Sequence, residues 1–180
     1  MLVTPMDVRG ALIVVPEVFR DARGYFKETY SRDRYRDAGI ADEFVQDNLS
    51  LSRAGTLRGL HGDPRMAKLV QVLAGQAYDV VVDARPQSPT YGRWQGVRLR
   101  GSEHAQLYIP PGCLHGFLAL ADDTLLSYKQ STAYDPNAEF AVAWDDPDLA
   151  IAWPLDGLRP ELSEKDRAHP TLRALSGLRA

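Results

Sequence analysis

Three side chains that can do chemistry lie close together in the sequence. The segment from Leu57 to Val70 reads LRGLHGDPRMAKLV and places Arg58, His61 and Lys68 within otherwise apolar, strand-like sequence. An imidazole takes up and releases a proton near neutral pH, and the two cations suit an anion or a developing oxyanion. The segment therefore predicts acid–base chemistry beside a negatively charged group.

Two of these side chains, His61 and Lys68, also have a purely structural interpretation. His61 follows an apolar run and precedes a Gly-Asp-Pro turn, and a single histidine in such a place is more often structural than functional. Lys68 heads the apolar run 69–73, where its charge either meets an anion inside the protein or reaches the surrounding water. The presence of Arg58 and Lys68 near His61 favours the functional interpretation.

Two further candidates lie outside this segment. His115 occurs in the sequence PPGCLHGF, where it is either a hydrogen-bonded core imidazole or a donor that faces a cavity. Tyr128 occurs in LLSYKQ and is either a core aromatic residue or an acid in a cavity. The residues alone favour the core interpretation for both.

Familiar catalytic motifs are missing from the sequence. The four histidines, His61, His104, His115 and His169, form no His-X-His pair and no His-Glu-X-X-His motif, so metal catalysis is disfavoured and we expect no metal site. Convergence of four ligands from distant strands is the alternative that the spacing leaves open. The sequence also lacks a P-loop, a Gly-X-Gly-X-X-Gly fingerprint and a Gly-X-Ser-X-Gly elbow. Kinases, Rossmann enzymes and serine hydrolases therefore have no support.

Short apolar runs separated by Gly, Pro and Asp turns must position these residues. Turns that recur at about 8 to 12 residues are typical of antiparallel sandwiches and barrels. We expect an all-β protein, a double-sheet jelly-roll β-sandwich with a few short peripheral helices, as one domain over residues 1–180. The expected strands cover residues 11–15, 25–30, 44–52, 68–73, 77–83, 96–99, 106–109, 114–120 and 125–130, and the expected helices lie at 31–40 and after Ser163.

Composition narrows the classes of partner. The chain has 180 residues and a formal net charge of −3, and its 21 basic and 24 acidic residues are dispersed, which argues against a nucleic-acid partner. No apolar run approaches the roughly 18 residues of a membrane helix. The single cysteine, Cys113, permits no intrachain disulfide and fits a reducing compartment. We therefore expect a cytoplasmic protein without a membrane partner.

Along nearly its whole length the chain resembles the dTDP-4-dehydrorhamnose 3,5-epimerase family of the cupin class. The matching pieces, in order, are FRDARGYFKE (19–28), QDNLS (46–50), LRGLH (57–61), KLV (68–70), DVVVD (79–83), SPTYG (88–92), IPPG leading to HGF (109–117), DP with WP (146–154) and SEKD (163–166). The resemblance implies a homodimeric cupin jelly roll that needs no cofactor. It also implies an epimerase that inverts C3, C5 or both in a nucleotide-linked 4-keto-6-deoxyhexose, through an enolate.

The resemblance assigns catalytic roles to four residues. His61 would be the base, and Asp166 would orient its imidazole and stabilise the imidazolium. Lys68 would stabilise the enolate oxygen, and Tyr128 would return a proton from the opposite face at C5.

The same resemblance implies a set of substrate contacts. Arg58 and Arg23 would bind the diphosphate. In a homodimer with exchanged N-terminal strands, the segment from Phe19 to Tyr30 would contribute to the site of the partner subunit. The remaining substrate-binding residues would be Phe19, Phe26, Glu28, Gln46, Asn48, His115 and Tyr134.

One segment departs from the family pattern. Family members usually have an aromatic residue and a glutamine after the catalytic histidine, followed by a longer loop, whereas residues 62–67 here read GDPRMA. This shorter loop keeps open a single-carbon epimerase and an enzyme for a GDP- or CDP-linked keto sugar. More remote alternatives are a keto-sugar isomerase and a non-catalytic nucleotide-sugar-binding cupin, and the four intact catalytic candidates argue against the latter.

Overall fold

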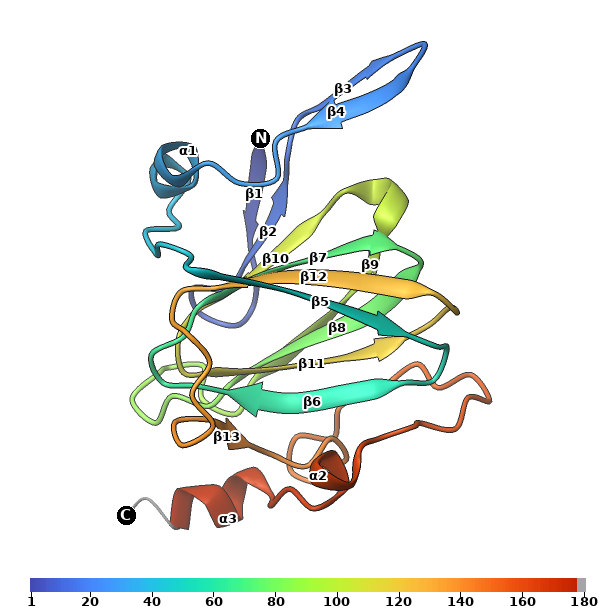
Figure 1. The fold of residues 1–180 in the computed structure, drawn as a ribbon. Helices are drawn as coiled ribbons and strands as arrows, with labels where there is room; N and C mark the ends of the chain where they lie inside the picture. Colours follow the sequence, from blue (N-terminus) through green and yellow to red (C-terminus); the bar gives the residue numbers. More distant parts are fainter. Residues whose placement is uncertain (178–180) are drawn as a thin grey trace.

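Two antiparallel β-sheets face each other in the computed structural model, which describes residues 1–177 (Figure 1). The first sheet has six strands in the order β1 (Leu2–Pro5), β2 (Leu12–Val15), β10 (Gln106–Ile109), β7 (Lys68–Ala74), β12 (Thr124–Gln130) and β5 (Gln46–Ser52). The second has five, in the order β13 (Phe140–Ala141), β6 (Leu57–Gly62), β11 (Cys113–Ala119), β8 (Gln76–Asp83) and β9 (Trp94–Arg100). The predicted cupin jelly-roll sandwich is confirmed.

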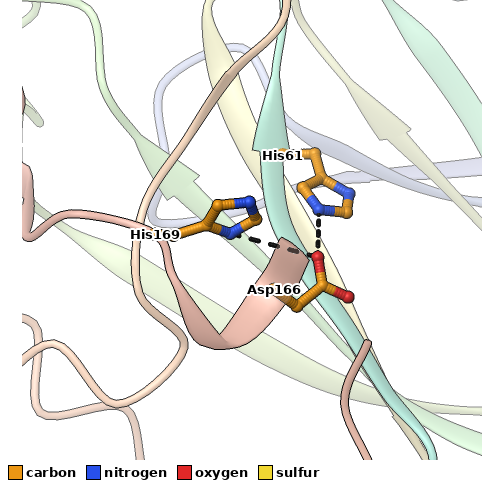
Figure 2. Close-up of side chains that lie close together, drawn as sticks. All are labelled: His61, Asp166 and His169. Atoms are coloured by element: carbon orange, nitrogen blue, oxygen red, sulfur yellow. Dashed lines mark hydrogen bonds and ion pairs between the residues drawn. The ribbon is translucent and has the colours of Figure 1, made fainter. Parts of the chain in front are cut away.

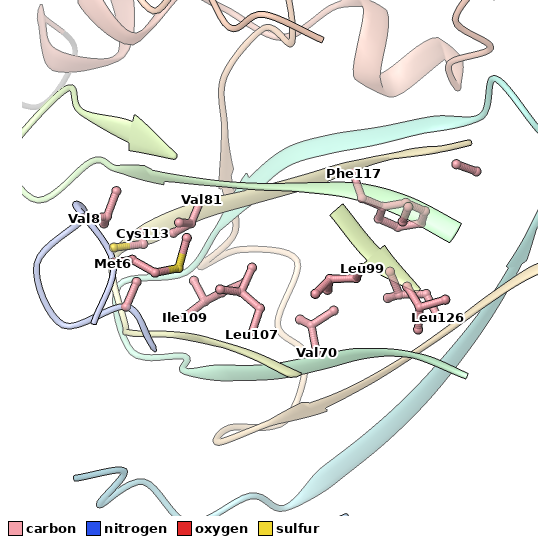
Figure 3. Close-up of a cluster of buried hydrophobic side chains, with 14 residues drawn as sticks. Met6, Val8, Val70, Val81, Leu99, Leu107, Ile109, Cys113, Phe117 and Leu126 are labelled. Atoms are coloured by element: carbon pink, nitrogen blue, oxygen red, sulfur yellow. The ribbon is translucent and has the colours of Figure 1, made fainter. Parts of the chain in front are cut away.

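The main core fills the space between the two sheets (Figure 3). Each strand turns alternate side chains inward, so that Val70 and Leu126 of the first sheet meet Val81 and Phe117 of the second. All four are at most 4% exposed, and burial of their apolar surface holds the sheets together. The polar side chains of the site lie at one end of this core.

The C-terminal segment covers the outer face of the second sheet (Figure 1). Leu149 and Leu172 pack there against Leu60 and Leu114. This packing brings α2 (Glu164–Arg167) close to β6. The N-terminus of α2 is capped by Ser163, whose hydroxyl accepts a hydrogen bond from the backbone N–H of Asp166, as the sequence pattern predicts.

The helices are short and peripheral. The helix α1 (Arg32–Asp37) packs on the outer face of the first sheet through Tyr35, and α3 (Leu172–Gly177) ends the described part of the chain. A single 3₁₀ turn, η1 (Gly101–Glu103), follows β9. Within residues 1–177 no helix is long and apolar enough to cross a membrane.

The N-terminal region differs most from the expectation. The predicted strand 25–30 is shorter, because only β4 (Gly24–Lys27) pairs, with β3 (Val18–Asp21), in a hairpin that projects from the sandwich (Figure 1). The backbone carbonyl of Thr29 instead accepts hydrogen bonds from the side chains of Tyr35 and Gln106. The β1 strand was not predicted, since four residues around a proline carry little strand signal.

Candidate active site

A cavity of about 300 Å³ opens at one end of the sandwich, between the two sheets. His61 of β6 and His115 of β11 reach it from the second sheet, and Lys68 of β7 and Tyr128 of β12 reach it from the first. Asp166 closes the cavity from α2. The other lining residues are Ser50, Arg58, Phe117, Leu126, Gln130, Tyr134, Glu139, Ser163 and Lys165.

The strand register places these side chains. His61 lies directly opposite His115 in the antiparallel pair of β6 and β11. Glycines allow this pair to approach closely, because a Cβ on Gly59 would lie 2.6 Å from the Cα of Gly116, and Gly59 also has a φ of +131°. In the local sequence RGLH, Gly59 therefore allows the close strand contact, and His61, two residues later, supplies the imidazole that reaches the cavity.

His61 and Asp166 form a hydrogen-bonded pair (Figure 2). The His61 Nε2–H donates to the Asp166 Oδ1 over 2.6 Å, which leaves Nδ1 as the remaining ring nitrogen. The side chain of Asp166 is only 6% exposed. Burial raises the pKa of this carboxyl, but the hydrogen bond and charge of His61 and the side chain of Ser163 outweigh it, so that the pKa is lowered. Asp166 is thus an anion that holds one tautomer of His61.

Lys68 and Tyr128 lie on the wall that faces this pair. The ammonium of Lys68 donates to the backbone carbonyl of His61 over 3.4 Å. Burial lowers the pKa of Lys68, against the opposing carboxylates of Glu139, Asp79 and Asp63. Burial also raises the pKa of Tyr128, against the charge of Arg58. A phenol that keeps its proton and the amine of Lys68 thus face the cavity.

Arg58 and His115 occupy two further sides of the cavity. The guanidinium of Arg58 donates to the hydroxyl of Ser52 over 3.3 Å and to the carbonyl of Leu51 over 3.4 Å, which are long, weak bonds. His115 is paired through Nε2 with the Oδ1 of Asp79 over 2.8 Å, and Asp79 is fully buried. Arg58 is therefore available to an anionic ligand, and His115 is held in one orientation.

Two charged lining residues were not assigned a role from the sequence. Lys165 and Glu139 form an ion pair at the cavity, in which the ammonium donates to the Glu139 Oε2. Lys165 belongs to the SEKD motif, and its place beside Asp166 is a signal that could have revealed it. Glu139 follows an irregular loop and carries no such signal, because its position depends on how that loop folds back.

Three predicted substrate contacts gather at the rim. The Gln46 Nε2 donates to the Asn48 Oδ1 over 3.0 Å, and the Gln46 Oε1 accepts from the backbone N–H of Tyr134 over 2.9 Å. Tyr134 lines the cavity and is half exposed. Gln46 and Asn48 are not among the lining residues, although Asn48 is paired with Tyr128 across β5 and β12.

The other four predicted contacts lie elsewhere, on the projecting hairpin and its continuation. Phe19, Phe26 and Glu28 line a second cavity beside Arg34 of α1, with which Glu28 forms an ion pair. Arg23, at the hairpin tip, is almost fully exposed and pairs with Asp21 over 2.6 Å. Within one chain these residues do not reach the cavity that contains His61.

Hydrogen bonds between charged side chains fix the short loop 62–67. The buried Asp63 accepts from the guanidinium of Arg65 through both carboxylate oxygens, at 3.2 and 3.1 Å. Arg65 also donates to the Oδ2 of Asp135 over 3.3 Å, next to Tyr134 in the sequence. The loop therefore supports the rim of the cavity.

These positions suit proton transfer beside a carbonyl group. His61 and the phenol of Tyr128 approach from facing sheets. Lys68 lies on the same sheet as Tyr128, with its Nζ 3.4 Å from the His61 carbonyl, where it can stabilise a developing enolate oxygen. His61 and Asp166 also lie near His169, and one ligand atom from each of the three falls within 4.8 Å of the others. Among the described residues, these three are the one group of His, Cys, Asp and Glu side chains that lie close enough together to hold a metal ion.

The chain is similar to known proteins in sequence and in structure over nearly its whole length. The family model for dTDP-4-dehydrorhamnose 3,5-epimerase matches residues 5–174. A protein of that description from Methanothermobacter thermautotrophicus is 46% identical over 167 residues, which cover 91% of this chain and 90% of the relative. The epimerase structure from Legionella pneumophila, in complex with dTDP-4-keto-L-rhamnose, is 42% identical with a TM-score of 0.93, over 98% of this chain and 95% of that one.

A relative with a narrower reaction is also similar. The structure of a 3'-monoepimerase from Streptomyces bikiniensis, in complex with dTDP-quinovose, is 37% identical to this chain. Its TM-score is 0.91, and the match covers 97% of this chain and 89% of that one.

Proposed function

This chain belongs to the dTDP-4-dehydrorhamnose 3,5-epimerase family and is an epimerase, and we propose that it inverts both C3 and C5 of dTDP-4-keto-6-deoxyglucose. The observation that carries the proposal is the His61–Asp166 pair, which faces Lys68 and Tyr128 across one cavity. A hydrogen beside a ketone is acidic because its removal gives an enolate. The reaction needs only groups that this cavity contains.

The first half of the reaction removes a proton. The Nδ1 of His61 takes the hydrogen from the carbon next to the C4 ketone, and the electron pair of that C–H bond moves to form the enolate. Asp166 stabilises the resulting imidazolium through the 2.6 Å bond to Nε2. Lys68 stabilises the enolate oxygen.

The second half returns a proton from the other side. At C5 the phenol of Tyr128 donates it from the facing sheet, which inverts the carbon. Arg58 binds the diphosphate, since its guanidinium lines the cavity with only long bonds to the protein. Tyr134, with Gln46 and Asn48 behind it, contacts the nucleotide at the rim.

A single-carbon epimerase is the second candidate. It is favoured by the short loop 62–67 and by the similarity to a 3'-monoepimerase at 37% identity. The Asp63–Arg65–Asp135 contacts support the rim beside Tyr134, so the loop can alter how the sugar lies against His61 and Tyr128.

We also propose a homodimer in which the N-terminal strands are exchanged and the hairpin serves the partner's site. Phe26 is 70% exposed and Phe19 is 55% exposed, and apolar rings this open are typical of an interface. The hairpin also carries Arg23, the second cation proposed to contact the diphosphate. The single, buried Cys113 fits a cytoplasmic location.

The test is incubation in heavy water with 4-keto-6-deoxy sugars linked to dTDP, GDP or CDP. NMR then locates the deuterium in each product. Deuterium at both C3 and C5 of the dTDP sugar is the expected result. Deuterium at one carbon supports the second candidate, and incorporation with another nucleotide overturns the proposed substrate. Saturable binding without exchange, or a relocated carbonyl, contradicts the proposed epimerisation.

A further inference from the structure

His169 is a buried histidine that the proposed reaction does not use. It follows α2, and its side chain is only 8% exposed. Neither of its ring nitrogens has a hydrogen-bond partner among the described residues. A buried polar group without a partner is costly, so these nitrogens are available to a ligand.

The surroundings of His169 supply more ligand atoms. Figure 2 shows its ring beside His61 and Asp166. Its Nδ1 lies 4.0 Å from the Oδ1 of Asp166, the same oxygen that His61 Nε2 contacts at 2.6 Å, and the two imidazole rings are 5.3 Å apart and nearly perpendicular. The backbone N–H of Ala143 donates to the Pro170 carbonyl over 2.8 Å, which fixes the segment that carries His169.

Two imidazoles and one carboxylate form a ligand set that zinc prefers. A tetrahedral zinc ion with bonds near 2.0 Å holds its ligand atoms about 3.3 Å apart. The observed separations of 2.6 Å and 4.0 Å lie on either side of this value, and all three atoms fall within 4.8 Å. Small side-chain rotations therefore suffice to place all three atoms around one ion, and water can supply the fourth ligand.

We propose that His61, Asp166 and His169 bind one Zn²⁺ ion, and that the bound ion switches off His61 as a base. The effect follows from the tautomer of the imidazole. In the free enzyme the Nε2 carries the proton, which it donates to Asp166, and Nδ1 has the free electron pair. Zinc takes the electron pair of Nε2, the Nε2 proton passes to solvent, and Nδ1 takes up one proton from solvent, so that the ring stays neutral with its proton on Nδ1 and no net proton is released. Such a ring cannot accept a proton from the sugar.

Zinc binding is measured first on the ligand-free protein, because a nucleotide diphosphate binds the ion itself. Titration calorimetry with Zn²⁺ is expected to give one ion per chain, and Co²⁺ is expected to give the visible absorption of a tetrahedral nitrogen and oxygen site. His169→Phe, which keeps the ring but loses both nitrogens, is expected to lower the zinc affinity at least about tenfold. His169→Gln is a second variant in case the first does not fold, and His104→Asn is the control at a histidine outside the cluster.

The functional arm rests on the proposed epimerase activity. Micromolar Zn²⁺ is expected to stop deuterium incorporation by the wild type, and a chelator is expected to restore it. His169→Phe is expected to keep its basal rate and to need at least about tenfold more zinc for the same inhibition. Equal zinc affinity in wild type and both His169 variants overturns the site, and full activity of the zinc-bound wild type overturns the switch. A wild type that binds zinc but turns over no keto sugar overturns the proposed function and leaves the site supported.

Discussion

Tyr128 and His61 approach the substrate cavity from different sheets, and this opposition decides what each can do to the sugar. A base and an acid on one wall would return the proton to the face it left. On facing walls they invert the carbon. In the proposed reaction the partly buried phenol, whose pKa burial raises, holds its proton until the carbanionic centre takes it.

Replacement of Tyr128 by Phe is expected to separate the two carbons. The variant should lose C5 inversion by about 10²-fold, because the donor on that face is gone, while His61 still exchanges the C3 hydrogen. Positional deuterium incorporation followed by NMR measures both rates. Ser127→Ala, the neighbouring change on β12, is the control and should match the wild type. An equal loss at both carbons would show that Tyr128 has a different role.

At this scale, sequence spacing alone brings three of the proposed site residues together. Arg58, His61 and Lys68 lie on β6 and at the start of β7, so a short stretch of sequence brings them together. The 2.6 Å contact between His61 and Asp166 was expected from the family resemblance alone. No local pattern reveals it, because it depends on the packing of the C-terminal segment against the second sheet.

At the scale of elements, charged hydrogen bonds join the short loop 62–67 to the rim of the cavity. Arg65 joins the buried Asp63 to Asp135, which precedes the irregular stretch before β13 and follows Tyr134. This contact lies outside the catalytic group and beside the residue proposed to meet the nucleotide. It should therefore influence binding more than chemistry.

Arg65→Ala is expected to raise KM about 3- to 10-fold, the loss of one or two charged hydrogen bonds at a rim, while kcat stays within about twofold. Arg65→Lys keeps the charge but loses the two-pronged contact with Asp63, and should give an intermediate KM. Steady-state kinetics measures both constants. Arg98→Ala, at an exposed position on β9, is the control. A fall in kcat with unchanged KM would contradict this account of the loop.

A second charged contact fixes the turn after β8. Asp83 is fully buried and accepts hydrogen bonds from Arg85, from the Ser88 hydroxyl over 2.5 Å and from the Thr90 hydroxyl over 2.5 Å. Burial raises the pKa of Asp83, but these donors outweigh burial and bring it to about 2, from 3.8. Since one pKa unit corresponds to about 1.4 kcal/mol, the ionised form adds about 2 kcal/mol to the free energy of unfolding.

Asp83→Asn should therefore destabilise the protein by about 2 kcal/mol at pH 7. The sign follows from the lowered pKa, because the stabilisation is complete above the unfolded value of 3.8 and is lost as the pH falls towards about 2. Urea unfolding of both proteins across this pH range measures the difference, which should shrink below pH 4. Asp123→Asn, at an exposed turn position, is the control. A constant difference at all pH values would contradict the charge-based explanation.

Turn spacing predicted most of the strands because Gly, Pro and Asp interrupt them in both sheets. It gave β7, β8, β11 and β12 to within one or two residues. It overextended β4, because the pattern of alternation continues past Lys27, whereas the chain leaves the hairpin there to reach α1. The limit lies in contacts between distant residues, such as that between Thr29 and Gln106, which have no local pattern.

At the scale of the whole molecule, the projecting hairpin is the feature that one chain leaves unexplained. Its apolar rings are exposed, and four predicted substrate contacts lie on it or just after it, away from the cavity of their own chain. A partner subunit would bury the rings and receive those contacts. Complete substrate binding would then require the dimer.

Native mass spectrometry is expected to give twice the chain mass of 20.0 kDa. Phe26→Asp should shift the protein towards the monomer, because it places a charge in the proposed interface, and should raise KM in parallel. Arg98→Asp, on the surface of the sandwich, is the control. A monomeric wild type with full activity would contradict the exchanged hairpin.

The proton-abstracting role of His61 is the central claim, and His61→Asn tests it most directly. The measurement is the initial rate of deuterium incorporation at C3 and C5 of dTDP-4-keto-6-deoxyglucose in heavy water, with folding verified by circular dichroism. Loss of the base at Nδ1 should lower both rates by about 10³-fold or more. Exchange at near wild-type rates in a folded His61→Asn protein would contradict the account.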